Sequence, residues 1–403
     1  MQLEDFRASI IITSYNGRDY LVEAVESVMA QTLHPHEIII ADDCSSDGSR
    51  EIIRSWEIQH PGWIKGVFQQ KNVGIPKNRN SALRTVTGNY VGILDGDDAF
   101  MPCKLEQQFK ALNAVPGSKV VYSNYRCVTT SGVELSRRYK EPQPQGEVLA
   151  EVASLNYGIP RTMLADYTAV KAAGLMNGQY PKLDGLMLSI ELASRCKFAY
   201  SHEILVNKKE YPESDSRQNT LLDILHDHVG IHRDIQPLLS VLDQSTIDSV
   251  NMHWYNRLAT LTNRLKEQQL AAAQLILSQS CGEGRSTAEC CLLLALINSR
   301  VGHDKEVNNV LRRAISMQPN NVFFQYQAGC VAVMCRKYSV AKEIFKRVLL
   351  LVPNLADAYF QLGNVCMATG KVANALGYYE QTLALQSDHE GALHMISSIT
   401  RHE

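Results

Sequence analysis

The sequence predicts a chain of two parts, an α/β domain with a mostly parallel sheet followed by an all-α solenoid of repeated helix pairs. Strand and helix patterns alternate over about 95 residues of the first part, which is typical of parallel strands covered by helices. From about residue 251 the strand patterns disappear and a period of 34 residues replaces them. The boundaries we expect are 1–215 for the α/β domain, 216–250 for a linker helix region and 251–403 for the repeats.

The composition is that of a globular protein without bulk affinity for nucleic acid. Of the 403 residues, 45% are hydrophobic and 20% are charged, and the net charge is −2. No apolar run is long enough to span a bilayer, and the N-terminus has no signal-peptide pattern. The ten cysteines include no C-x-x-C pair. We therefore expect reduced thiols in a cytoplasmic protein, with peripheral attachment to a membrane left open.

Four buried strands are expected in the first domain, each followed by a helix or a polar loop. Continuous β-branched runs are typical of strands that are covered on both faces. Serine and aspartate cap candidates in "SSDGS" precede one of the helical patterns. The strand patterns are 9–15, 37–43, 63–69 and 90–95, and the other helical patterns lie near 20–31 and 75–87.

Polar side chains follow three of these strands. Ligands of parallel sheets bind beyond the carboxyl ends of the strands, so these residues are candidates for a site. Three carboxylates within four positions repel one another unless a cation or good donors compensate, and oxygen clusters suit Mg²⁺ or Mn²⁺. The alternative is a solvated acidic turn. The candidates are Thr13 and Tyr15 after the first strand, Asp42 and Asp43 after the second, and Asp95, Asp97 and Asp98 after the fourth.

The second part has an internal period of 34 residues. Shifting the sequence by 34 aligns Ala295 with Gly329 and Gly363, where two helices would cross closely, and aligns Leu311 with Phe345 and Tyr379. Small residues at a crossing and an aromatic residue in the second helix resemble the tetratricopeptide repeat. The clear copies are 288–321, 322–355 and 356–389, and a weaker one begins near Trp254.

Three histidines lie in the linker helix region, after a polar loop near residues 210–219. His228 and His232 are four residues apart, a spacing that some zinc sites use, and His226 is close to them. No carboxylate or cysteine completes a convincing ligand set. We therefore expect a solvated or interface face of a helix rather than a metal site.

The first part resembles the family 2 glycosyltransferases, which have the GT-A fold. The resemblance spans about residues 8–210 and is carried by the order and spacing of "IITSYNGRDYLVEAVESVMAQT", "EIIIADDCSSDGS", "NVGIPKNRNSAL" and "GNYVGILDGDD". It implies transfer of a sugar from a nucleotide diphosphate donor, with UDP favoured, with inversion at the anomeric carbon and usually with Mn²⁺ or Mg²⁺.

The resemblance also implies roles on the donor side. Thr13 and Tyr15 match positions that line the pocket for the base, where an aromatic ring can stack. Asp43, with Asp42 as a helper, matches the carboxylate that accepts hydrogen bonds from the base, and Arg79 matches an arginine near the base and the diphosphate. The alternatives are turn polarity, a loop or helix cap, and a surface arginine.

The acidic motif and a later aspartate carry the remaining implied roles. Asp95 matches the position that faces the ribose, and Asp97 and Asp98 match the positions that reach the metal. Asp184 falls where the family keeps its general base, although an N-cap role suits that place equally. Tyr157 and Arg161 are candidates for acceptor contacts, with packing or surface roles as alternatives.

These observations favour an inverting, metal-dependent glycosyltransferase whose repeats recruit its acceptor or a partner. The acceptor could be a glycan, a protein or a lipid-linked molecule, and the repeats could bind a protein or peptide or mediate self-association. A non-catalytic scaffold with a degenerate transferase fold is the main alternative. A nucleotidyltransferase is a third, but "TSYNGRDY" is not the Gly-rich, basic loop that such an enzyme places after its first strand.

Overall fold

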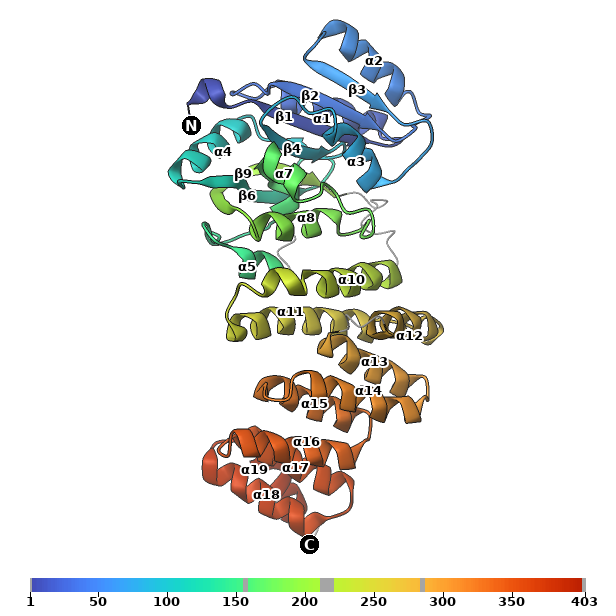
Figure 1. Ribbon diagram of the computed structural model, residues 1–403, viewed down its shortest axis with the longest axis vertical. Helices are drawn as coiled ribbons and strands as arrows, with labels where there is room; N and C mark the ends of the chain where they lie inside the picture. The colour runs from blue at the N-terminus through green and yellow to red at the C-terminus, as the bar shows by residue number, and fades with distance from the viewer. Residues whose placement is uncertain (1, 155–158, 211–220, 283–286, 401–403) are drawn as a thin grey trace. The chain divides into compact units, whose positions relative to one another are not determined.

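The computed structural model describes residues 2–154, 159–210, 221–282 and 287–400. The chain divides into two compact units, Met1–His253 and Trp254–Glu403, which Figure 1 draws from blue to red along the chain. The described part of the expected linker helix region, from residue 221 onward, lies within the first unit. The expected α/β part and the expected all-helical part are both confirmed.

A mixed sheet forms the centre of the first unit. Its order in the described residues is β3-β2-β1-β4-β8-β6-β9-β5, and β7 pairs with β6. The run from β3 to β4 is parallel, as the sequence predicts, whereas β8 pairs antiparallel with both β4 and β6. The strands are β1 Ala8–Ser14, β2 Glu37–Asp42, β3 Ile64–Phe68, β4 Tyr90–Asp95, β5 Ala99–Phe100, β6 Ser118–Val128, β7 Glu134–Arg137, β8 Leu164–Asp166 and β9 Lys197–Lys209.

Helices connect the strands and pack on the sheet. The loop at 139–148 that separates β7 from the next helix has no regular structure apart from a bridge between Gly146 and Phe198. The helices are η1 Leu3–Asp5, α1 Arg18–Met29, α2 Ser49–Gln59, α3 Ile75–Leu83, α4 Lys104–Ala114, α5 Leu149–Ala153, α6 Ile159–Thr162, α7 Tyr167–Ala172, α8 Asp184–Ala193 and α10 Leu221–Leu239. The next helix, α11 (Gln244–Asn263), runs from the first unit into the second.

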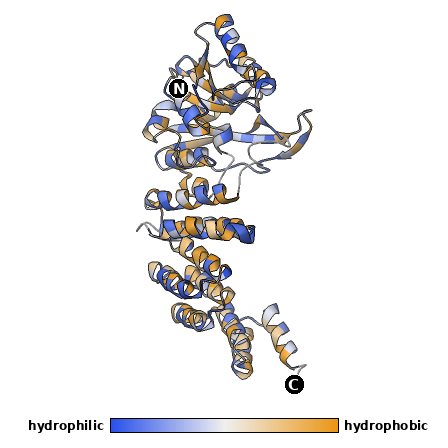
Figure 2. Ribbon diagram, turned by 90° about the vertical axis from the view of Figure 1, so that its right-hand side faces the viewer, coloured by the Kyte–Doolittle hydropathy of each residue, from blue (hydrophilic) through white to orange (hydrophobic). Residues whose placement is uncertain are grey.

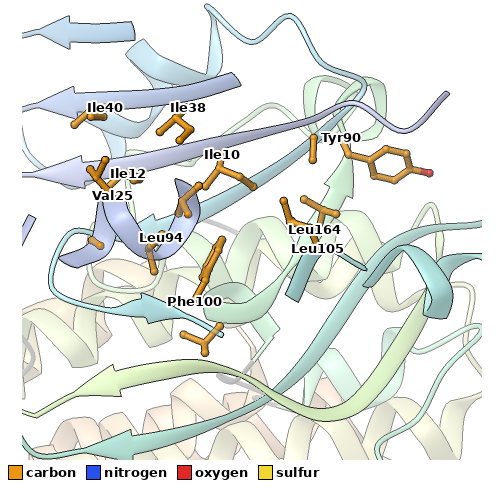
Figure 3. Packing of buried hydrophobic residues seen from close by; sticks show 14 of the residues in the cluster. Ile10, Ile12, Val25, Ile38, Ile40, Tyr90, Leu94, Phe100, Leu105 and Leu164 are labelled. Atoms are coloured by element: carbon orange, nitrogen blue, oxygen red, sulfur yellow. The ribbon is translucent and has the colours of Figure 1, made fainter. Parts of the chain in front are cut away.

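The core of the first unit follows the two-residue period of its strands. Ile10 and Ile12 of β1 and Ile38 of β2 face the same side, where they pack against Val25 of α1 and Leu105 of α4, as Figure 3 shows. The isoleucines between them face the opposite side and are also fully buried. Both faces are therefore covered, which explains why these strands read as continuous apolar runs.

The strand register brings the ends of three strands to one edge. Thr13 of β1 pairs with Ala41 of β2 and with Asp95 of β4, and Ser14 pairs with Asp42. Each strand then turns into a loop that carries the predicted polar residues. The edge formed by the ends of β1, β2 and β4 is therefore where a site can form.

The second unit is built from helix pairs with an identical spacing. The first and last residues of both helices recur every 34 residues in the pairs α13/α14, α15/α16 and α17/α18. Figure 2 shows that hydrophobic and hydrophilic residues alternate within the helical part of the chain. None of the described helices is long and apolar enough to cross a membrane. The helices are α12 Glu267–Gly282, α13 Ala288–Arg300, α14 Asp304–Met317, α15 Val322–Met334, α16 Tyr338–Leu351, α17 Ala356–Ala368, α18 Val372–Leu385 and α19 Glu390–Thr400.

Each of the two later pairs crosses at a glycine that faces an aromatic ring. A Cβ added to Gly363 would lie 2.4 Å from a ring carbon of Tyr379, and one added to Gly329 would lie 2.6 Å from a ring carbon of Phe345. The small residue lets the two helices approach, and the ring fills the crossing. Assignment of these pairs to the tetratricopeptide repeat remains a prediction.

We predict that Gly363→Ala destabilises the second unit, although alanine is ordinarily the better helix former. The clash with Tyr379 should lower the free energy of unfolding by about 1–3 kcal/mol, as overpacking in cores does. Gly377→Ala in α18 is the matched control, because a Cβ there meets open space and should stabilise the helix by up to about 1 kcal/mol. Urea unfolding followed by circular dichroism measures both, and equal effects of the two variants would contradict the packing argument.

Candidate functional site

One guanidinium joins two predicted site residues that lie far apart in the sequence. Arg79 of α3 places Nη1 3.0 Å from both carboxylate oxygens of Asp184 and Nη2 2.6 Å from Oδ1 of Asp95. Its neighbour Asn78 is buried and donates from Nδ2 to the Ala41 carbonyl at 2.8 Å, which fixes the helix against β2. Arg79 is therefore an inward residue of the site, not a surface arginine.

Asp184 is the first residue of α8, and its carboxylate does not serve as an ordinary N-cap. The N-cap position is Leu183, which makes no side-chain cap, and Asp184 accepts from the N–H of Gly185 at 2.8 Å and from Arg79. Only 5% of Asp184 is exposed. The side chain is thus oriented by its ion pair with Arg79, which also binds Asp95 at the end of β4.

A second arginine pairs with the acidic motif. Arg161 of α6 contacts Asp98 and lies 3.4 Å from Oδ2 of Asp95. The other oxygen of Asp98 accepts from the N–H of Lys209 at 3.1 Å, and Asp98 is only 3% exposed. Protein groups therefore engage both oxygens of Asp98, whereas Asp97 is half-buried.

The three carboxylates of the motif have different electrostatic environments. Burial alone would raise the pKa of Asp95, but the charges of Arg79 and Arg161 outweigh it and hold the pKa below its usual value. Burial, together with the charge of Asp95, raises the pKa of Asp97. Burial also raises the pKa of Asp98, although the charge of Arg161 opposes the shift. Burial and the neighbouring carboxylates therefore outweigh the opposing positive charges at Asp97 and Asp98, but not at Asp95.

The donor set fits a hard divalent cation that shares its coordination with a ligand. Four carboxylates, Asp95, Asp97, Asp98 and Asp184, face two guanidinium groups, which leaves a formal charge of −2. Among the described residues no three acidic, histidine or cysteine side chains form a preformed metal cage. Mg²⁺ commonly binds through one or two carboxylates plus substrate phosphates, and such a site needs no cage.

The segment that carries Arg161 is anchored by a buried polar network. Thr162 accepts through its carbonyl from Lys104 Nζ at 3.1 Å and from Gln108 Nε2 at 2.7 Å, and its hydroxyl donates to the carbonyl of Ser123 at 3.1 Å. Lys104 is fully buried, and its Nζ lies 4.5 Å from the centre of the Phe100 ring. Burial lowers the pKa of Lys104 to about 7.

The predicted base-pocket residues lie at the ends of β1 and β2. Tyr15 is 54% exposed, as a ring that stacks on a ligand would be, and Thr13 Oγ1 donates to Asp95 at 3.4 Å. Asp43 accepts from the N–H groups of Val73 and Gly74 at 2.7 and 2.9 Å, so it shapes the loop before α3.

Asp42 occupies a different environment from its neighbour. It is fully buried, accepts from the N–H of Ser45 at 3.1 Å and lies 3.4 Å from Nε of Arg50. These contacts place it behind the loop and away from a ligand surface, so a direct helper role for Asp42 would require the loop to rearrange.

A cavity of about 320 Å³ opens beside the ion pairs. Arg79, Asp95, Arg161 and Asp184 all line it, and most of its other lining residues are apolar. Among the described residues the buried Nε of Arg79 has no hydrogen-bond partner. Arg79 therefore lines the cavity while one of its donors is left without a protein partner.

The structure brings most predicted residues to one edge but leaves others outside the site. Tyr157 lies outside the described residues. The prediction of a solvated or interface face for the linker histidines is wrong for His228 and His232, which are fully buried and bond the Ile224 carbonyl and Asn251. Burial lowers the pKa of His232 to about 4, so this side chain is a neutral core residue.

The sequence did not predict that Lys104 and Gln108 hold the segment that carries Arg161. Lysine is rarely fully buried, so nothing in the pattern "CKLEQQF" distinguishes Lys104 from a surface residue.

Comparison with known protein families covers the part of the chain that carries Arg79 and the acidic motif. Residues 9–158 match the model described as Glycosyl transferase family 2. This part of the first unit is therefore similar to that family. Asp184, the described strands β8 and β9, and the helical repeats lie beyond the matched residues.

Relatives show the same similarity in sequence. The chain is 37% identical over 136 residues to TuaG of Bacillus subtilis (strain 168), whose name describes a glycosyltransferase of teichuronic acid biosynthesis. The matched residues cover 34% of this chain and 53% of TuaG. It is 25% identical over 274 residues to an uncharacterized glycosyltransferase of Rickettsia typhi, with 66% of this chain and 83% of the relative covered. The chain thus spans about half the length of TuaG.

Solved structures have a similar fold. The S. aureus TarS fragment 1–349, solved in complex with UDP-GlcNAc, gives a TM-score of 0.57 at 17% identity and covers 78% of this chain and 92% of the fragment. The complex of the same fragment with UDP gives a TM-score of 0.56. At this identity the likeness establishes the fold alone.

We predict that Lys104 makes the stability of the protein depend on pH between about 7 and 8.5. Lysine has a pKa near 10.5 when unfolded and about 7 here, so in this window the unfolded state binds more protons. Stability then rises with pH, by at most about 1.4 kcal/mol per unit. Urea unfolding at several pH values should show that Lys104→Met removes this rise, and parallel curves for the two proteins would contradict the assignment.

Proposed function

We propose that the protein is an inverting glycosyltransferase that moves a sugar from a nucleotide diphosphate donor to an acceptor. The observation that carries the proposal is the Arg79 bridge, which holds Asp95 at the end of β4 and Asp184 at the start of α8 at a single point. Asp95 is the expected ribose contact and Asp184 the expected base. In this proposal the donor and the base would both lie beside the Arg79 guanidinium.

The donor is a UDP-sugar in this proposal. Support comes from the TarS structures, which contain UDP and UDP-GlcNAc on a similar fold. The base would stack on Tyr15, whose ring is exposed at the end of β1. Thr13 would line the same pocket, and the diphosphate would lie toward Arg79 and the acidic motif.

A divalent cation, Mn²⁺ or Mg²⁺, would be held by Asp97 and Asp98. When bound, the cation supplies positive charge for the departing diphosphate. The pKa values of both carboxyl groups are raised, and a nearby cation would favour the ionised form of each.

Asp184 would remove the proton from the acceptor hydroxyl. Its two oxygens are oriented by Arg79, and the N–H of Gly185 supports one of them. A carboxylate fixed in this way can accept a proton without first rotating into place. Arg161 lines the same cavity, so an acceptor entering beside Asp184 would pass close to it.

The repeats would recruit the acceptor or a protein partner. Stacked helix pairs with a constant spacing of 34 residues form extended surfaces that commonly bind peptides. A non-catalytic scaffold is the second candidate, and the ordered helix pairs are what favours it. The retained ion-pair network argues against it, because such a network is costly to keep without a ligand.

Donor hydrolysis tests the proposal. The full chain is incubated with UDP-, GDP- and dTDP-sugars in Mn²⁺, Mg²⁺ or EDTA, and release of nucleoside diphosphate is measured. We expect cation-dependent release from one donor. Asp97→Ala should reduce it by at least about a hundredfold, since the phosphate charge is no longer neutralised.

Asp184→Asn separates chemistry from donor binding in the same assay. It should leave UDP binding by calorimetry within about threefold of wild type and remove transfer, because an amide cannot accept the proton. Undiminished turnover in this variant would refute the base assignment. No UDP binding and no release by the wild-type protein would favour the scaffold.

A further inference from the structure

The segment that leads into Asp184 lies against α10. Tyr180 is 2% exposed, and its hydroxyl donates to Asp234 of α10. A Cβ added to Gly230 would lie 2.3 Å from a ring carbon of Tyr180. Only glycine at position 230 allows the ring to rest on the helix in this way.

A buried carboxylate of α10 also holds the backbone of this segment. Asp227 is 1% exposed, and its Oδ2 accepts from the N–H of Lys182 at 2.7 Å, two residues before Asp184. Nδ1 of His226 lies 3.2 Å from the other oxygen. Burial raises the pKa of Asp227, and the backbone N–H groups of Lys182 and Leu183 act against that rise.

No side chain caps the first turn of α8 from the N-cap position. Leu183, at the N-cap position, has no side-chain oxygen to offer, and the carboxylate of Asp184 is turned toward Arg79. The backbone just before α8 is therefore fixed from another helix. Burying an acidic side chain for this purpose is costly, which indicates that the position of the segment matters.

We propose that α10 positions the general base: Asp227 and Gly230 set the backbone from Tyr180 to Leu183 so that the Asp184 carboxylate meets Arg79. This inference rests on the proposed role of Asp184. Asp227 and Gly230 are positioning residues, since they act through the segment and lie outside the reacting groups. A base displaced by about 1 Å can lose a hundredfold in rate, so these contacts matter for turnover.

The test uses the full chain with UDP-GlcNAc as donor and Mn²⁺ as cation. Asp227→Ala should lower kcat for UDP release by at least about tenfold, with KM and UDP affinity within about twofold of wild type, because only the base is displaced. Asp227→Asn should restore most of the rate, since its amide oxygen still accepts from Lys182. Asp223→Ala, an exposed acidic residue of the same helix, is the matched control and should change nothing.

A second measurement does not depend on enzymatic turnover. Hydrogen exchange followed by mass spectrometry should show faster exchange at residues 180–187 in Asp227→Ala, with residues 9–42 unchanged. Gly230→Ala should do the same by displacing Tyr180, and it decides the question if Asp227→Ala fails to fold. If the wild-type protein releases no UDP, the proposed function fails, yet exchange still tests the positioning.

Two results would overturn the inference. One is unchanged exchange at residues 180–187 in both Asp227→Ala and Gly230→Ala. The other is equal loss of UDP binding and kcat in Asp227→Ala with no rescue by Asp227→Asn, since a general loss of structure would act in that way.

Discussion

The site depends on the ion pairs of Arg79. The guanidinium binds Asp95 at the end of a parallel strand. It also binds Asp184 at the start of a helix, 105 positions after Arg79 in the chain. Burial alone would lower the pKa of Arg79, but the charges of Asp184 and Asp95 raise it, so the side chain stays charged. Truncating Arg79 would leave the buried carboxylate of Asp184 without its counter-charge, and such losses typically cost about 3–5 kcal/mol. The donor side and the base are thus coupled through one residue.

The residues that hold this bridge in place have no part in the proposed chemistry. Asn78 fixes α3 to β2, the buried Lys104 and Gln108 hold the segment of Arg161, and Asp227 of α10 holds the segment before Asp184. Each support is a buried polar group with its partners satisfied, which is how a protein holds side chains in one geometry. The negative charge that remains in the cluster is a property of this arrangement, and it suits a cation and a diphosphate that bind together.

The sequence was sufficient for the parallel strands and for the ends that carry Asp95 and Asp43, because buried strands leave continuous β-branched runs. It was also sufficient for the 34-residue helix pairs. The antiparallel strand β8, which joins the two halves of the sheet, was not predicted, since it is only three residues long and its partners are remote. The pairing of Arg161 with Asp98 and the burial of Lys104 depend on tertiary contacts between distant segments. Asp184 was found only through the family resemblance.

We propose that Asp184 activates the attacking hydroxyl or water directly, from the side of the sugar opposite the departing diphosphate. Proton NMR of donor hydrolysis at early times measures it, because the two anomers of the released sugar have distinct signals before they equilibrate. If hydrolysis inverts the anomeric carbon, we expect an α-linked donor such as UDP-GlcNAc to release the β anomer of the sugar first. Initial release of the α anomer would contradict it and would require a covalent intermediate or another base.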